Sequence, residues 1–163
     1  AYHLWDGNSD QEKDFKYKWL GDEFETNLPN ELNFILEGKN AEKIKNLFKN
    51  DTRVVVPKIF WDYTHAKVLV MSFEEGKSIT DMKYLIENKF NLQEVSSLLC
   101  EVFYKQIFRY GFVHSDPHPG NIFIRKERIQ GNKFQTRLVL LDHGLYRDYD
   151  DHFRYNYCNL WRG

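Results

Sequence analysis

The sequence predicts an α+β fold, and three features of the chain carry this prediction. Apolar side chains recur at helical spacing along two long stretches, residues 31–49 and 91–110. Short runs of β-branched and aromatic residues, typical of strands, follow the first stretch and flank a later loop. That loop, residues 114–121, is rich in Asp, Asn, Pro and Gly, which turns favour. Helices and strands in one chain indicate an α+β fold.

Two helices are predicted near the start of the chain. Residues 1–14 are polar and are expected to form a loose segment. Residues 13–27 carry aromatic side chains at near-helical spacing, which predicts an amphipathic helix. Pro29 separates this helix from a second one, Glu31 to Lys49. The apolar stripe of the second helix consists of Leu32, Ile35, Leu36, Ile44, Leu47 and Phe48.

Short strands and one long helix are predicted in the middle of the chain. The strand candidates are residues 54–56, 58–61 and 67–72. Glu74-Glu75-Gly76 then forms a connector, and Asn91-Leu-Gln-Glu94 has the pattern of a capping box that starts a helix. Gly111 is expected to end that helix. Its inward-facing side chains are Val95, Leu98, Leu99, Val102 and Ile107.

The last third of the chain is predicted to contain three strands and a helix. Two short strands flank the 114–121 loop, a buried strand at 138–141 ends on Asp142, and residues 130–133 form a turn. A final helix carries Phe153, Tyr157, Leu160 and Trp161. The aromatic cluster of Tyr155, Tyr157 and Trp161 is expected to belong to a helix core.

The loop His114-Ser-Asp116-Pro-His-Pro-Gly-Asn121 and the later Leu141-Asp142-His143-Gly144 carry the chemistry. Phosphoryl transfer needs metal ions held on the phosphates and a carboxylate that positions the accepting hydroxyl group. Asp116 can act as that base, while Asn121 and Asp142 can offer oxygen atoms to the metal. Mg²⁺ prefers a few such ligands together with substrate phosphates. The sequence therefore predicts a phosphoryl-transfer site made by these three side chains.

Two other interpretations of the same loop remain at this point. An Asp and an Asn separated by four residues also occur in ordinary turns. His114, Asp116 and His118 could instead be ligands at alternate positions in a zinc or iron site. Pro117 disfavours the regular strand that such spacing would need, and no further carboxylate–histidine cluster completes a ligand set.

Length and composition favour one globular domain. The chain has 163 residues, of which 42% are apolar and 17% aromatic, enough to build a core. Its net charge of −1 gives no indication of binding to nucleic acid. No run of roughly 18 apolar residues predicts a membrane span. Cys100 and Cys158 lack a Cys-x-x-Cys spacing and are expected to be buried, reduced thiols.

The motifs in order resemble the aarF-domain-containing, or UbiB, family of atypical kinase-like proteins. The match is to its mitochondrial members, which carry Asp-His-Gly instead of Asp-Phe-Gly. It runs from about residue 15 to residue 163, through segments 27–43, 54–61, 68–76, 111–121, 140–146 and 155–161. Aminoglycoside and choline kinases share a similar loop but lack the Glu31/Glu37 segment and the Asp-His-Gly. The resemblance implies a partial protein-kinase-like fold, with an incomplete small lobe at 15–73 and part of the helical large lobe at 74–163.

The resemblance also implies roles for residues outside the loop. Glu37 matches the helix glutamate that pairs with a strand lysine to hold ATP phosphates. Adenine would contact the inter-lobe connector at Met71, Ser72 and Phe73. Glu31 matches the first residue of the family's Glu-x-Asp signature, but the second acidic position holds Asn33. The implied cofactors are ATP and Mg²⁺.

The expected function is that of an ATP-dependent phosphotransferase or ATPase. The resemblance implies a mitochondrial parent protein linked to lipid or quinone homeostasis, with peripheral membrane association open to it. No Gly-rich phosphate loop, Val-Ala-x-Lys-like strand or Lys-x-Gly-Gln segment is present, so the chain is expected to be a fragment that is inactive alone. The alternative is a non-catalytic, nucleotide-binding pseudokinase that acts as a scaffold or regulator.

Overall fold

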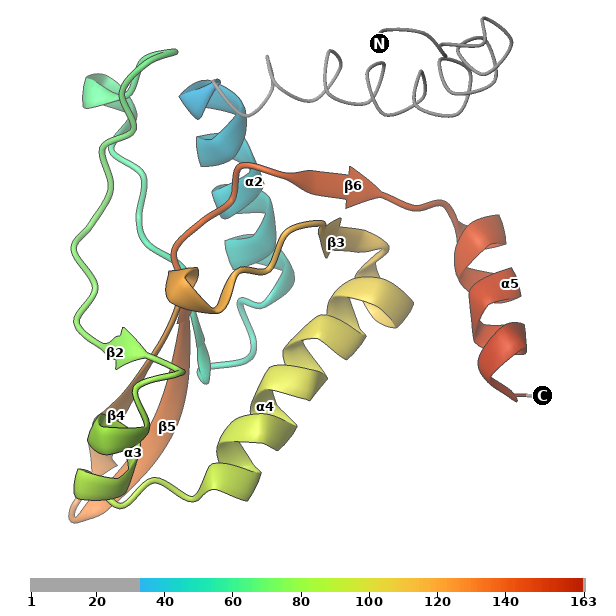
Figure 1. Ribbon diagram of the computed structural model, residues 1–163. Helices are drawn as coiled ribbons and strands as arrows, with labels where there is room; N and C mark the ends of the chain where they lie inside the picture. The colour runs from blue at the N-terminus through green and yellow to red at the C-terminus, as the bar shows by residue number, and fades with distance from the viewer. Residues whose placement is uncertain (1–32, 163) are drawn as a thin grey trace, which may run out of the picture.

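The computed structural model describes residues 33–162, and these residues form a mixed α+β fold (Figure 1). The expected loose segment 1–14, the expected helix 13–27 and Glu31 lie outside the described residues. The helices are α2 (Phe34–Leu47), α3 (Met82–Glu87), α4 (Leu92–Tyr104) and α5 (Asp151–Arg162), with the short helical turns η1 (Trp61–Tyr63), η2 (Lys105–Tyr110) and η3 (Pro119–Asn121). The strands are β1 (Val54–Val55), β2 (Lys77–Ser78), β3 (Phe112–His114), β4 (Ile122–Gln130), β5 (Lys133–Leu140) and β6 (Tyr146–Asp148).

The main sheet has the strand order β1-β5-β4-β2. Its centre is the antiparallel β4–β5 hairpin, which turns at residues 131–132 as the sequence predicts. β1 pairs in parallel with β5, with Val54 opposite Leu138. A long intervening chain is what such a parallel pairing requires. β1 from the first half of the chain therefore shares a sheet with the strand that leads to Asp142.

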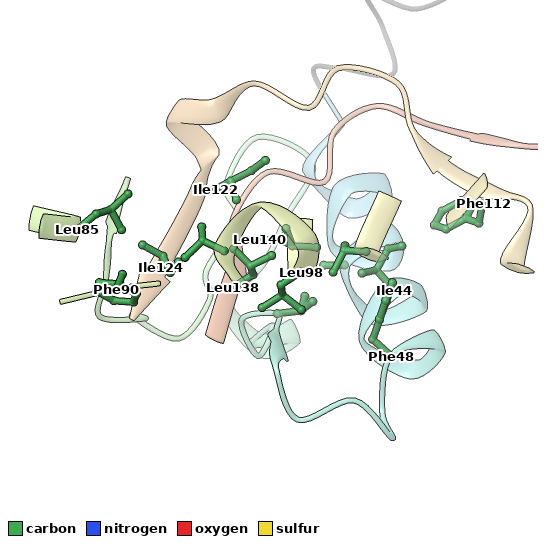
Figure 2. Packing of buried hydrophobic residues seen from close by; sticks show 14 of the residues in the cluster. Ile44, Phe48, Leu85, Phe90, Leu98, Phe112, Ile122, Ile124, Leu138 and Leu140 are labelled. Atoms are coloured by element: carbon green, nitrogen blue, oxygen red, sulfur yellow. The ribbon is translucent and has the colours of Figure 1, made fainter. Parts of the chain in front are cut away.

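One buried cluster joins the sheet to helices α2 and α4 (Figure 2). Ile44 of α2, Leu98 of α4 and Leu138 of β5 are almost fully buried. Removing one of these aliphatic side chains from water is worth about 1.5–3 kcal/mol. The core therefore fixes α2 and α4 relative to the β4–β5 hairpin, whose ends lead to the loops of interest.

The start and the end of α4 follow from local sequence. The Asn91 side chain accepts hydrogen bonds from the Gln93 and Glu94 N–H groups, which confirms the predicted helix start. The helix then continues as the single wide turn η2 and ends at Gly111, which has φ +63°. Glycine suits this position because the left-handed conformation is costly for residues with a Cβ atom. The chain can thus turn directly into β3.

A charged cluster ties the loop before β1 to α4 and η2. Arg53 donates to both carboxylate oxygens of Asp51 and to Glu101, and Lys105 bonds the same two acids at 2.8 and 2.7 Å. Hydrogen bonds from Arg53 hold the pKa of Asp51 well below its usual range. They also lower the pKa of Glu101, to about 2. Both acids are therefore charged at neutral pH, and the cluster fixes the β1 loop on η2.

The strands predicted at residues 58–61 and 67–72 do not form as regular strands. The two segments still lie antiparallel, because the Phe60 N–H donates to the Val70 carbonyl and the Ser72 N–H to the Lys58 carbonyl. Only isolated bridges result, and η1 begins at Trp61. Pro57 offers no N–H to a ladder at the start of the first segment, which keeps the pairing short. The prediction of regular strands at residues 58–61 and 67–72 is therefore wrong.

Helix α5 lies to one side of the molecule, beyond β6 (Figure 1). Tyr157 stacks on Phe108 of η2 with ring centroids 5.6 Å apart. Tyr155 and Trp161 are 68% and 70% exposed, so the expectation that they form a helix core is wrong in the described part of the chain. The physical reason is that α5 packs against η2 through the helix face that carries Tyr157, and its other faces are open to solvent. The thiols are free, but Cys100 is exposed rather than buried.

None of the helices among residues 33–162 is both long and apolar enough to cross a membrane.

Candidate functional site

Strand pairing brings the two motif loops together. β3 pairs with β6, placing His114 opposite Tyr146, and β4 pairs with β5, placing Ile122 opposite Leu140. The loop between β3 and β4 must therefore face the loop between β5 and β6. Two further backbone bonds, Ser115 N–H to the Leu145 carbonyl and Leu141 N–H to the Asn121 carbonyl, extend this contact. Residues 115–121 and 141–145 thus form one site.

Asp142 is held from both sides. Its Oδ2 accepts a hydrogen bond from Asn121 Nδ2 at 2.8 Å, and its Oδ1 accepts one from the Gly144 N–H at 2.9 Å. A carboxylate oxygen can only accept here, so the Asn121 amide must present its nitrogen to Asp142. The Asn121 oxygen is consequently the part of the amide that remains for another partner.

His114 connects the backbones of the two loops. Its Nδ1 accepts from the Asp116 N–H at 3.1 Å, so the proton of the neutral ring lies on Nε2. Nε2 is 3.0 Å from the Asp142 carbonyl oxygen and donates to it. Burial lowers the pKa of His114, which keeps the ring neutral. His114 therefore positions Asp116 and Asp142 rather than acting as a base.

Two side chains of helix α2 form hydrogen bonds with the backbone N–H and carbonyl groups of His143. The His143 N–H donates to Glu37 Oε1 at 3.2 Å, and Asn40 Nδ2 donates to the His143 carbonyl at 2.9 Å. Burial raises the pKa of Glu37, and the negative charge of Asp142 raises it further as a smaller cause. The position of α2 is thereby coupled to the residue next to Asp142.

The His143 ring is a buried anchor. Its Nε2 donates to the Leu140 carbonyl at 3.0 Å, and its Nδ1 accepts from the Tyr146 hydroxyl at 3.1 Å. Burial lowers the pKa of His143 to about 4, so the ring is neutral near pH 7. The His143 ring therefore packs and forms hydrogen bonds inside the fold.

A cleft of about 390 Å³ opens above these loops. Glu37, Asp116 and Asp142 line it, together with Phe34, His114, Gly144 and Leu145. Asp116 is exposed to solvent at this cleft. Of the residues selected from sequence, Glu37, Asp116 and Asp142 therefore converge directly, and Asn121 joins them through its bond to Asp142.

The other selected residues lie elsewhere. Met71, Ser72 and Phe73 precede β2 and are not part of the lining of this cleft. The Ser72 N–H already donates to the Lys58 carbonyl, and Phe73 is 90% exposed. Asn33 caps α2 by accepting hydrogen bonds from the Ile35 and Leu36 N–H groups. Asn33 stands where the family signature has an acidic residue, and its role in this structure is that of a helix cap.

The geometry argues against a zinc or iron site at the loop. Both ring nitrogens of His114 are engaged, and His118 Nδ1 accepts from the Gly120 N–H. In residues 33–162 no three His, Cys, Asp or Glu side chains are placed to hold a metal ion. Asp142 and Asn121 nonetheless supply hard oxygen donors side by side. Such a small donor set fits Mg²⁺ that arrives with substrate phosphates, because Mg²⁺ takes few protein ligands.

Two supporting residues were not singled out from sequence. Asn40 holds the His143 carbonyl, and Gln106 accepts a hydrogen bond from the His114 N–H at 2.9 Å. Gln106 follows Val95, Leu98 and Val102 along the inward stripe of α4, so a polar residue at this position was the available signal. A glutamine in an apolar stripe must be hydrogen-bonded when it is buried.

The comparison with protein families decides the affiliation. A sequence model described as the ABC1 atypical kinase-like domain matches residues 5–163. The chain belongs to this family. The expected resemblance is thereby confirmed, and the loops around Asp116 and Asp142 are part of an ABC1 domain.

Curated relatives agree with this assignment. AarF domain-containing kinase 1 of Drosophila melanogaster is 49% identical over 148 residues, which cover 91% of this chain and 28% of that protein. AarF domain-containing protein kinase 1 of Mus musculus is 42% identical over 149 residues, with the same two shares. The chain therefore spans about 28% of the length of these relatives.

Solved structures confirm the kinase-like α+β fold. The Rv3197–erythromycin complex from Mycobacterium tuberculosis matches with a TM-score of 0.60 and 23% identity, over 81% of this chain and 31% of that one. The Rio2 kinase–ADP/Mg²⁺–phosphoaspartate complex from Chaetomium thermophilum matches with a TM-score of 0.51 and 17% identity, over 82% and 37%. The ABC1 domain described here corresponds to part of that fold.

Proposed function

We propose that the full-length protein is an ATP-dependent phosphotransferase or ATPase whose Mg²⁺–ATP site includes Asp116, Asn121 and Asp142. The observation that carries this proposal is the hydrogen bond between Asn121 and Asp142 at the edge of a cleft that Asp116 also lines. Phosphoryl transfer relies on positioning and charge stabilisation rather than on covalent help from protein, and this constellation supplies both. The solved Rio2 kinase complex, which shares the fold, contains ADP and Mg²⁺.

Each side chain has a distinct task in this proposal. Asp116, held in place by the bond from its N–H to His114, accepts the proton of the acceptor hydroxyl group or water as the acceptor oxygen attacks the γ-phosphorus and ADP leaves. Asp142 and the Asn121 oxygen would hold Mg²⁺, and the metal would supply neutralisation of the phosphate charge. Glu37 holds the backbone next to Asp142 in place by accepting a hydrogen bond from the His143 N–H.

The backbone near Met71, Ser72 and Phe73 is the proposed adenine contact. Because the Ser72 N–H is bonded to Lys58, hydrogen bonds to the purine would come from other backbone groups of this segment. The family resemblance adds a mitochondrial location and a link to lipid or quinone homeostasis. Fractionation of cells that express the tagged full-length protein tests the location.

A non-catalytic nucleotide-binding scaffold is the second candidate, and Asn33 is the observation that favours it. Asn33 replaces an acidic residue of the family signature, and its side chain caps α2. It cannot supply the negative charge that a catalytic or regulatory use of the signature would need. This scaffold would bind Mg²⁺–nucleotide through Asp142 but would show no turnover in the wild-type protein.

Replacing Asp142 with alanine tests the proposed nucleotide site. We expect the full-length variant to bind ATP at least about 10-fold more weakly in the presence of Mg²⁺, since charge-assisted contacts to the metal and to Asn121 are lost together. Without Mg²⁺, its affinity should differ little from that of the wild type. Calorimetric titration with and without Mg²⁺ measures both.

Asp62→Ala is the matched control, because Asp62 is an exposed carboxylate on η1, outside the cleft lining. Equal loss of affinity in both variants, or an Asp142→Ala variant with unchanged Mg²⁺-dependent binding, would show that Asp142 is not part of the nucleotide site.

A further inference from the structure

Gln106 is a fully buried glutamine at the wide turn between α4 and β3. Its Oε1 accepts from the His114 N–H at 2.9 Å. A backbone N–H can only donate, so the amide cannot be turned over in this site. Its Nε2 is buried and has no hydrogen-bond partner among residues 33–162. A buried amide that lacks a partner carries its full desolvation penalty, and folded proteins meet such groups with ordered water.

A small cavity of about 10 Å³ lies between Gln106 and the 114–121 loop. Its polar lining comes from Gln106, His114, His118, Asn121 and Asp142, and its other lining residues are apolar. About one water molecule fits a space of this size, because a water needs roughly 10–15 Å³ for its centre together with two to four polar partners. The cavity is too small for a nucleotide or any organic ligand.

We propose that Gln106 is a positioning residue that holds the 114–121 loop through one buried water. The inference rests on the proposed function of that loop. Gln106 fixes His114 directly through Oε1, and its Nε2 donates to a water in the cavity that bridges to the loop. His114 in turn holds the Asp116 N–H and the Asp142 carbonyl, so the amide of Gln106 acts on both motif loops.

The wide turn η2 explains how the glutamine reaches this place. Gln106 is the second residue of the π-helical turn that follows the regular helix from Lys105 onward. Single π-turns are often found at functional sites. The turn is anchored independently by the bonds of Lys105 to Asp51 and Glu101, so its position does not depend on the glutamine.

Three variants of the full-length protein test the inference. Gln106→Met keeps the approximate volume but removes both hydrogen-bonding groups. Gln106→Glu keeps an acceptor for the His114 N–H and removes the donor to the water. Gln93→Met is the matched control, because Gln93 is an exposed glutamine on the same helix. All measurements are made at a temperature at which circular dichroism shows each variant to be folded.

The first readout does not require activity. We expect amide hydrogen exchange at residues 114–121 to become at least about 10-fold faster in Gln106→Met, intermediate in Gln106→Glu and unchanged in Gln93→Met. A crystal structure of the wild type should show one water within about 3.2 Å of Gln106 Nε2. Unchanged exchange in Gln106→Met, or a Gln106 Nε2 bonded to protein with no water in the cavity, would overturn the inference.

The second readout separates positioning from mere stability. Gln106→Met should lower kcat by about 10- to 100-fold, because small displacements of catalytic groups have such effects, while the Kd for Mg²⁺–ATP changes by less than about 3-fold. A normal kcat in folded Gln106→Met would contradict the positioning role. Absence of turnover in the wild type would instead refute the proposed function, and the exchange and water measurements would still decide the role of Gln106.

Discussion

Replacing Asp116 with asparagine in the full-length protein is expected to lower the rate of phosphoryl transfer or ATP hydrolysis by about 100-fold or more. Asparagine has nearly the same size, and the bond from the residue 116 N–H to His114 is made by the backbone, so the loop should keep its shape. The amide cannot accept a proton from the acceptor hydroxyl group or water. Release of ADP measured in single-turnover and steady-state assays gives the change in rate.

The affinity for Mg²⁺–ATP should change little in the same variant, because Asp116 is assigned to the acceptor and not to the phosphates. Asp62→Asn serves as the control for a lost carboxylate outside the cleft. Turnover that survives Asp116→Asn at the wild-type rate would show that the base is another residue. A wild-type protein that binds nucleotide but never turns it over would favour the scaffold instead.

Gly111→Ala is expected to be the most destabilising single substitution at the base of the site. A Cβ atom at this position would clash with the Tyr149 carbonyl oxygen and lie 2.9 Å from Arg154 Cδ, and φ is +63°. The strained backbone and the forced separation of these groups together should cost about 3 kcal/mol or more. Because Gly111 leads from η2 into β3, the 114–121 loop should be displaced as well. Thermal unfolding of the full-length protein and its turnover measure the two effects.

Gly131→Ala is the natural control, because Gly131 has φ +56° but no atom lies within 4 Å of its added Cβ. The free energy of unfolding of this variant should fall only by the cost of the left-handed conformation for alanine, about 1–2 kcal/mol, and its turnover should be normal. If the two alanine variants are equally stable, the close approach of Gly111 to Tyr149 is not a feature of the folded protein.

Local sequence signals predicted much of this fold because their causes are local. The side chain of Asn91 and the conformation of Gly111 set the two ends of the α4–η2 helix, and both were readable as cap residues. The turn at residues 130–133 and the β-branched runs around it predicted the β4–β5 hairpin. The residue types of the 114–121 loop and of the later Asp142-His143-Gly144 motif also predicted a site made by Asp116, Asn121 and Asp142.

Features that depend on distant contacts were not readable in this way. The parallel pairing of β1 with β5 joins segments about 84 residues apart, and no local pattern encodes it. The hydrogen bonds of Asn40 and Glu37 with the His143 backbone likewise depend on how α2 packs on the core. The aromatic residues of α5 had helical spacing, but spacing alone does not tell which face is covered. Asn33 occupies a position of the family signature, and a residue of this type before a helix is also a common cap.

The most direct test of the central claim is a crystal structure of the full-length protein with ADP and Mg²⁺. The proposed site predicts a metal ion with Asp142 and the Asn121 amide oxygen as ligands, at about 2.0–2.1 Å. It also predicts the phosphates in the cleft lined by Glu37 and Asp116. A nucleotide bound elsewhere, or a metal ion in contact with neither Asp142 nor Asn121, would contradict the assignment of this cleft as the phosphoryl-transfer site.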